Sequence, residues 1–239
     1  MQVVVGSHFR QKATNTKIAL FNLLALMNTL TLLVLLFATM AMCVGHQKNT
    51  MTFVYHPKTA GGVKGFIRVH YLYRRSKYAG AVIVANLDVK HAQGDALHKS
   101  DAKCVGPIKQ FKWHIHTKWE NPTSSGFLSA CSLAKTSNHY DPNYACGPAS
   151  EHVTEAKCKA LTPHYKCTPH TYKANPKACE KGDLSGKLGD FHVKKGKIRG
   201  KWYDPHFPKP SEVTPSWNII LHAVCGADTP RFVCAKAVK

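Results

Sequence analysis

The sequence predicts an all-β domain after residue 50, built as an antiparallel sandwich or barrel and held by disulfides. Three observations predict this class: short stretches of alternating apolar and polar residues, turn-forming spacers between them, and very little helical periodicity. Gly, Pro, Asn and Asp fill spacers such as "YDPNYACGP" and "DPHFPKPSEVTP". Many short strands without intervening helices are typical of sandwiches and barrels.

Five stretches are expected as strands, at 65–73, 80–89, 109–117, 197–204 and 217–224. Successive side chains of a strand point to opposite faces, so an alternating stretch buries one face and exposes the other. In 109–117 the apolar members are Phe111, Trp113 and Ile115. We therefore expect these three side chains to lie in the core.

Residues 1–45 differ from the rest of the chain. Three basic residues precede an apolar stretch, residues 18–44, that contains no charge. This pattern is typical of a secretory signal peptide, and the stretch is also long enough to be a retained type II signal anchor. Both alternatives place the remaining domain, residues 46–239, in an exported and oxidising compartment.

The cysteines agree with export. One of the nine, Cys43, lies in the apolar stretch, and an even number remains in the exported part. Those eight are Cys104, Cys131, Cys146, Cys158, Cys167, Cys179, Cys225 and Cys234. They predict up to four disulfides, although spacing leaves about 105 pairings open. No C-x-x-C pair occurs, which argues against a zinc-finger site.

The charge is strongly positive, with 33 Lys and Arg against 13 Asp and Glu and a formal net charge of +20. Such a charge favours an anionic partner or substrate. The basic residues are scattered, with no run of five, which disfavours a nucleic acid. An anionic polysaccharide or cell surface and a small anionic substrate stay open.

The segment from 140 to 180 interrupts the alternating pattern. It is rich in Pro, Lys and Cys and shows no periodicity. A loop of that length inside a compact domain is uncommon unless it is functional or stapled. Its four cysteines predict that disulfides hold it.

The stretch "FKWHIHTKW" carries the first chemical signal. His114 and His116 are two positions apart, so a strand would place both imidazoles on one face, about 6–7 Å apart. An exposed polar face with two incidental histidines remains the alternative. Two more candidates are His139 in "SNHYDP" and His222 in "NIILHAV". Four imidazoles without a thiolate would suit copper or zinc.

Taken in order, these motifs resemble the copper-zinc superoxide dismutases over about residues 60–239. The series is "HIH" on a strand, a cysteine followed by "NHYDP", then "GDLSGKLG", a late strand histidine and "PRFVCA". The resemblance implies a Greek-key β-sandwich or barrel of the immunoglobulin-like kind and superoxide as substrate.

The resemblance also implies site residues. Copper would be bound by His114, His116, His139 and His222. Arg231 would be the cation that guides superoxide to the metal, and Cys131 would pair with Cys234.

Two departures from the family favour its extracellular copper-only branch. Glu180 stands three residues before Asp183, where the two-metal enzymes have a zinc histidine. His222 and Cys234 are only 12 positions apart, which leaves no room for the family's long electrostatic loop. A carboxylate that accepts an imidazole N–H is a standard way to orient a metal-binding histidine. We therefore expect Glu180 to be the partner of His139, with Asp183 supporting that region.

Two alternatives remain from the sequence. His152, His164 and His170 could rebuild a zinc site with Asp183, or the 140–180 segment could be a decoration that binds a partner or limits access. The expected activity is that of a secreted, copper-dependent superoxide dismutase. The alternative is an inactive relative that binds copper or polyanions.

Overall fold

The computed structural model describes residues 49–238. The predicted targeting segment, residues 1–45, lies outside the described residues. Within 49–238 there is no helix with the length and apolar character needed to cross a membrane.

Nine antiparallel strands form the domain, in two layers that share one edge. The first layer contains β1 (Thr50–Tyr55), β2 (Lys64–Arg74), β3 (Lys77–Asp88) and β7 (Lys197–Asp204). The second contains β4 (Gln110–His116), β5 (Ser125–Phe127), β6 (Phe191–His192), β8 (Asn218–Ala223) and β9 (Arg231–Val238). The crossovers that pair β3 with β7, β4 with β8 and β1 with β9 are of the Greek-key kind. The predicted all-β class is confirmed.

The five predicted strands correspond to β2, β3, β4, β7 and β8. The strands β1, β5, β6 and β9 were not predicted. In β9 the four residues Phe232–Ala235 are buried in succession, because the layer packs against the core on one face and against the 131–139 loop on the other. A strand that is covered on both faces loses its alternation.

The core lies between the two layers. Phe111, Trp113 and Ile115 are all fully buried in it, as the alternation of their stretch predicted. The Trp113 ring stacks on Phe191 with 4.3 Å between centroids, and its indole N–H donates to the carbonyl of Gly189 at 2.9 Å. These contacts fix the position of β4, so the side chains on its opposite face are also held in fixed positions.

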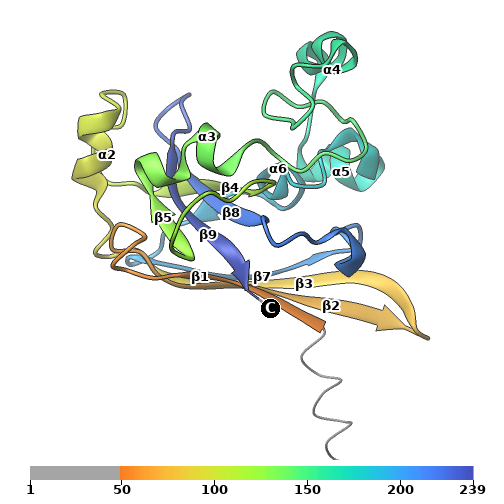
Figure 1. Cartoon of the computed structure of the whole chain (residues 1–239), viewed down its shortest axis with the longest axis horizontal. Coiled ribbons are helices and arrows are strands. Elements are labelled where there is room, and N and C mark those ends of the chain that lie inside the picture. Colours follow the sequence, from red (N-terminus) through yellow and green to blue (C-terminus); the bar gives the residue numbers. More distant parts are fainter. Residues whose placement is uncertain (1–48, 239) are drawn as a thin grey trace, which may run out of the picture. The chain divides into compact units, whose positions relative to one another are not determined.

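Short helices cover that opposite face of β4 and β8 (Figure 1). They are α3 (Leu133–Thr136), α5 (Pro169–Ala174) and α6 (Leu184–Leu188). The helix α4 (Ala156–Leu161) lies farther from the sheet, and α2 (Gly94–Ser100) lies at one end of the domain. The 140–180 segment therefore contains α4 and α5, although the sequence showed no periodicity there. Each of these two helices has only six residues, which is too short for a helical pattern of apolar residues to repeat.

Four disulfides join the eight cysteines of the described part of the chain. The pairs are Cys104–Cys225, Cys131–Cys234, Cys146–Cys158 and Cys167–Cys179. The last two close small loops inside the 140–180 segment, which is stapled as predicted. The first two link positions more than 100 residues apart and so tie distant parts of the second layer together.

Candidate metal centre

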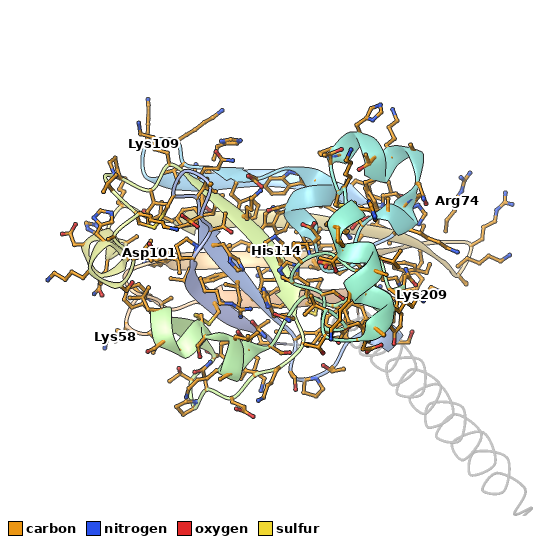
Figure 2. The ribbon with its side chains drawn as sticks, turned by 90° about the horizontal axis from the view of Figure 1, so that it is seen from above. Lys58, Arg74, Asp101, Lys109, His114 and Lys209 are labelled. Atoms are coloured by element: carbon orange, nitrogen blue, oxygen red, sulfur yellow. A yellow bond between two sulfur atoms is a disulfide. The ribbon has the colours of Figure 1, made fainter. Side chains whose placement is uncertain are left out.

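Four histidines converge on the covered face of the second layer. His114 and His116 project from the same face of β4, and His222 lies on the neighbouring strand β8. His139 reaches the same place from the loop after α3, where it bridges to His116. One ligand nitrogen of each ring lies within 4.8 Å of the others, and all four residues are buried. His114 lies near the centre of the view in Figure 2, while Lys58, Arg74 and Lys109 lie toward the rim.

Three of these rings are oriented through their Nδ1 atoms. The N–H of His116 donates to the carbonyl of Ser137 at 2.9 Å, and that of His222 to the carbonyl of Thr229 at 3.0 Å. Nδ1 of His139 lies 2.6 Å from Glu180 Oε2. Since these acceptors hold the proton on Nδ1, the lone pair of each neutral ring is on Nε2, which is where a metal would bind.

The lone pairs face one another. His116 Nε2 and His222 Nε2 are only 3.4 Å apart, although each ring already donates through Nδ1. Two neutral acceptor nitrogens at that distance repel each other. The arrangement therefore fits a bound cation between the rings.

His114 is oriented the other way. Its Nε2 lies 3.5 Å from Asp183 Oδ1, while its Nδ1 is buried and has no hydrogen-bond partner within residues 49–238. A buried unpaired nitrogen is costly unless something satisfies it. A metal in the cluster would take this Nδ1 as its fourth nitrogen ligand.

Three of the four imidazoles, those of His114, His116 and His222, are held in the neutral form. Burial and then the neighbouring imidazoles lower the pKa of His114 and His116 well below the usual value. The same two causes lower the pKa of His222 to about 3. Neutral imidazole is the form that binds metals, so the site needs no proton release from these three rings.

Glu180 is almost completely buried behind His139. Burial raises the pKa of this carboxyl, and the contact with His139 opposes that effect. Its Oε2 faces the imidazole, while its Oε1 approaches the backbone of Gly147 so closely that a Cβ there would lie 2.3 Å away. The carboxyl thus lies between Gly147 and the histidine cluster.

Asp183 lies beside His114 rather than beside His139. Its Oδ1 accepts from the N–H of Gly186 at 2.8 Å, which caps the start of α6, and its Oδ2 accepts from the hydroxyl of Tyr165 at 2.8 Å. Burial, then the carboxyls of Asp183 and Glu180, raise the pKa of Tyr165, so this hydroxyl stays protonated and able to donate.

Arg231 is the first residue of β9 and pairs with His222 in the sheet. Its guanidinium donates to Thr136 Oγ1 at 2.6 Å and to the carbonyl of Ser137 at 2.9 Å. Burial lowers its pKa to about 10, which still leaves it charged at neutral pH. The carbonyl of Ser137 thus positions both Arg231 and His116.

A cleft of about 520 Å³ leads to the cluster. Its lining includes Lys112, His114, His139, Tyr165, Glu180 and Arg231. Lys112 faces His222 across the strand pair, and its Nζ lies 3.4 Å from Asp190 Oδ2. Two cations thus line an opening that ends at nitrogen ligands, which suits a small anion.

Lys112 and Tyr165 were not predicted. Lys112 could have been found from the sequence, because it stands two positions before His114 and so shares its strand face. No pattern singles out Tyr165.

The alternative zinc site is not assembled. His152 pairs with Glu155 at 2.7 Å and stacks on Tyr144, and Asp183 contacts other groups. Besides the four histidines, the described part of the chain has one other group with metal-ligand atoms, Asp141 with Cys146 and Cys158, but these cysteines form a disulfide.

No protein-family model and no curated protein matches the chain. Among solved structures, the chain is similar to the Cu(II) form of Candida albicans superoxide dismutase 5, with a TM-score of 0.45 and 18% identity over 79% of this chain and 90% of that chain. It is also similar to the Cu/Zn superoxide dismutase of Brucella abortus, with a TM-score of 0.35 and 16% identity over 78% of this chain and 97% of that chain. Both likenesses are distant, so the chemistry has to be argued from the histidine cluster itself.

Proposed function

We propose that this chain is an exported superoxide dismutase with a single copper site and no zinc. The observation that carries the proposal is the 3.4 Å approach of the Nε2 atoms of His116 and His222 among buried, neutral imidazoles. That arrangement is unfavourable for the protein alone and favourable around a cation. The proposed activity comes from the sequence resemblance. The two cations that line the cleft, Lys112 and Arg231, are the reason to propose an anionic substrate.

Copper fits the four nitrogens better than other common metals. No thiolate or carboxylate is among the four donor residues, and copper(II) favours a tetragonal nitrogen set, while copper(I) accepts fewer nitrogens. The chemistry that bound copper would supply is oxidation of one superoxide anion to oxygen and reduction of a second to hydrogen peroxide.

Glu180 supports a site without zinc. It accepts the Nδ1–H of His139, which is the nitrogen that a second metal would otherwise take. With that proton held on Nδ1, Nε2 of His139 is the atom that can bind copper or take up one of the two protons that each cycle consumes. Glu180 would thus hold the His139 ring in place while Nε2 of that ring changes its partner between copper and a proton.

The substrate is held near the ligands by charge. Arg231 is fixed by Thr136 and Ser137, and Lys112 lies on the other side of His222. Neutral ligands leave the positive charge of the metal uncompensated, which adds to the attraction for superoxide. The other surface lysines contribute less to the attraction of superoxide, because salt at physiological concentration screens charges that are more than about 8 Å apart.

Export is part of the proposal. Disulfides such as the four described here persist in oxidising compartments. The apolar residues 18–44 provide a signal peptide or a type II anchor. The N-terminal residue of the mature protein, determined by mass spectrometry, distinguishes these two.

The test is to secrete the chain from a eukaryotic host and to measure copper, zinc and superoxide turnover on the same sample. We expect near-stoichiometric copper, no zinc and high turnover, and His116→Ala should lose copper and turnover together. The matched control is His152→Ala, which removes a histidine outside the cluster and should lose neither. A folded, disulfide-bonded protein without copper, or one with copper and no turnover, would reject the proposal. The latter result would favour the inactive copper-binding alternative.

A polyanion-binding role is a second candidate, and one observation favours it. A groove of about 650 Å³ shares no residue with the copper cleft, and its lining includes Lys90, Lys109 and Lys195 against one acidic residue, Asp95. Replacing these three lysines with glutamine should reduce retention on a heparin column and leave turnover unchanged. Equal retention of wild type and variant would reject this role for the groove.

A further inference from the structure

Tyr165 connects the 140–180 segment to both carboxylates behind the histidine cluster. Its hydroxyl donates to Asp183 Oδ2 at 2.8 Å and accepts from the backbone N–H of Glu180 at 3.2 Å. It also lines the cleft that leads to the histidines. One hydroxyl therefore contacts the two residues that stand directly behind two of the four imidazoles.

Through Asp183 the hydroxyl acts on His114. The two oxygens of Asp183 are divided between the N–H of Gly186, which binds Oδ1, and Tyr165, which binds Oδ2. With both oxygens engaged the carboxylate has a single orientation, and in it Oδ1 lies 3.5 Å from His114 Nε2. Without the tyrosine hydroxyl, Oδ2 loses this partner, and of these two bonds only that from the N–H of Gly186 still holds the carboxylate.

Through Glu180 the hydroxyl acts on His139. It binds the backbone of Glu180, whose side chain lies 2.6 Å from His139 Nδ1. It thereby fixes the chain position from which the carboxyl reaches the imidazole.

Two disulfides and a close glycine contact of the 140–180 segment hold Tyr165 in this position. The disulfide Cys167–Cys179 joins a residue two positions after Tyr165 to the residue just before Glu180. On the other side, Gly147 lies so close that an added Cβ would sit 2.9 Å from the Tyr165 ring and 2.3 Å from Glu180 Oε1. Cys146, next to Gly147, is tied to Cys158. Both staples of the segment therefore lie next to these contacts.

We propose that Tyr165 is a positioning residue for the metal site, and that the 140–180 segment is a stapled element that delivers its hydroxyl to Glu180 and Asp183. The inference rests on the proposed copper site but not on superoxide turnover. It gives the segment a role inside the site, in place of a decoration at its rim.

The experiment compares Tyr165→Phe with wild type in three measurements: the Cu(II) electron paramagnetic resonance spectrum, copper affinity by chelator competition, and superoxide turnover. Loss of an outer hydrogen bond to a metal-binding group typically costs 10–100-fold in metal affinity or activity, and we expect a loss near the lower end, about 10-fold. The copper spectrum should change as well, because His114 and His139 lose their fixed orientations. The matched control is Tyr144→Phe, which removes a hydroxyl from the same segment outside the cleft and should change none of the three.

If Tyr165→Phe folds and has the spectrum and affinity of wild type, the inference is wrong and the ring merely covers the site. If that variant does not fold, Gly147→Ala replaces it, because the added Cβ must displace Glu180 or Tyr165. An unchanged copper spectrum in Gly147→Ala would equally overturn the inference. A wild-type protein that binds copper through nitrogen but has no turnover would reject the proposed function and leave the spectral test of Tyr165 intact.

Discussion

Glu180 Oε2 and His139 Nδ1 lie 2.6 Å apart, and both side chains are buried. The carboxylate of Glu180 accepts the hydrogen bond from Nδ1 of His139, the ring nitrogen that is not directed at the other three imidazoles. A second metal at this nitrogen would have to displace Glu180. The pair therefore supports the proposed site with a single metal.

Glu180→Ala should lower both copper retention and turnover. Without its acceptor, His139 loses the contact that selects its tautomer and fixes its ring, for which a 10–100-fold loss is typical. Copper retention is measured by competition with a chelator, and turnover by a superoxide assay on metal-loaded protein.

The chain offers a matched control for this variant. His152 and Glu155 form a similar pair at 2.7 Å, but on the exposed part of the 140–180 segment. Glu155→Ala should leave copper retention and turnover unchanged. Equal behaviour of the two variants would contradict the assignment of Glu180.

Lys112→Gln should reduce kcat/KM for superoxide and leave copper affinity nearly unchanged. Lys112 lines the cleft without binding the cluster, so it contributes to attraction of the anion. Loss of one such charge should lower the rate several-fold at low salt, and less at high salt, because salt screens the interaction.

The salt dependence distinguishes this effect from a structural one. Lys159→Gln removes an equal charge from the exposed surface of α4 and should leave the rate and its salt dependence close to those of wild type. If Lys112→Gln and Lys159→Gln behave alike, Lys112 has no guiding role.

Asp204→Asn should destabilise the domain. It should also make the free energy of unfolding depend less on pH in the acid range. Asp204 Oδ2 lies 2.7 Å from Lys187 Nζ, and both are buried where α6 meets β7. Burial alone would raise the pKa of Asp204, but Lys187 and the hydroxyl of Tyr172 outweigh it, so the pKa is lowered. Breaking a buried pair typically costs about 3–5 kcal/mol.

The direction of the pH effect follows from the lowered pKa. Asp204 contributes stability above its unfolded pKa of about 3.9, and that contribution is lost as pH falls through the lower folded pKa. Urea unfolding between neutral pH and about pH 2.5 measures it. The variant should lose less stability on acidification than wild type, whereas Asp228→Asn, in an exposed pair with Lys103, should match wild type. Parallel curves for wild type and Asp204→Asn would contradict the assignment.

The sequence predicted five of the strands, β2, β3, β4, β7 and β8, and missed β1 although its burial alternates. His114 and His116 could be paired because a strand has a fixed period. His139 and His222 were further candidates, and the resemblance to a family joined them to the pair as copper ligands. The strand β9 was not predicted, and its four central residues, Phe232–Ala235, are buried in succession without alternation. Tyr165 could not be predicted either, because its place depends on which cysteines pair, and spacing does not determine pairing.

Removing the Cys131–Cys234 disulfide should impair the site as well as the fold. The bond spans 103 positions, and a loop of that size corresponds to about 4.7 kcal/mol in the chain-entropy view. Arg231 also donates to the carbonyl of Cys131, at 3.3 Å, and to Ser137, which in turn holds His116. The double variant Cys131→Ser, Cys234→Ser should therefore unfold at lower urea concentration and, while still folded, show reduced kcat/KM.

The Cys104–Cys225 pair is the matched control, because it spans 121 positions and neither of its cysteines lines the copper cleft. Removing this disulfide should lower the free energy of unfolding by a similar amount, because it frees a loop of similar length in the unfolded chain. It should leave kcat/KM of the folded protein unchanged. Measuring both variants at a temperature where each is fully folded separates the two effects. If both lose kcat/KM equally, the loss comes from general destabilisation, and the 131–137 loop does not position Arg231 and His116 through its disulfide.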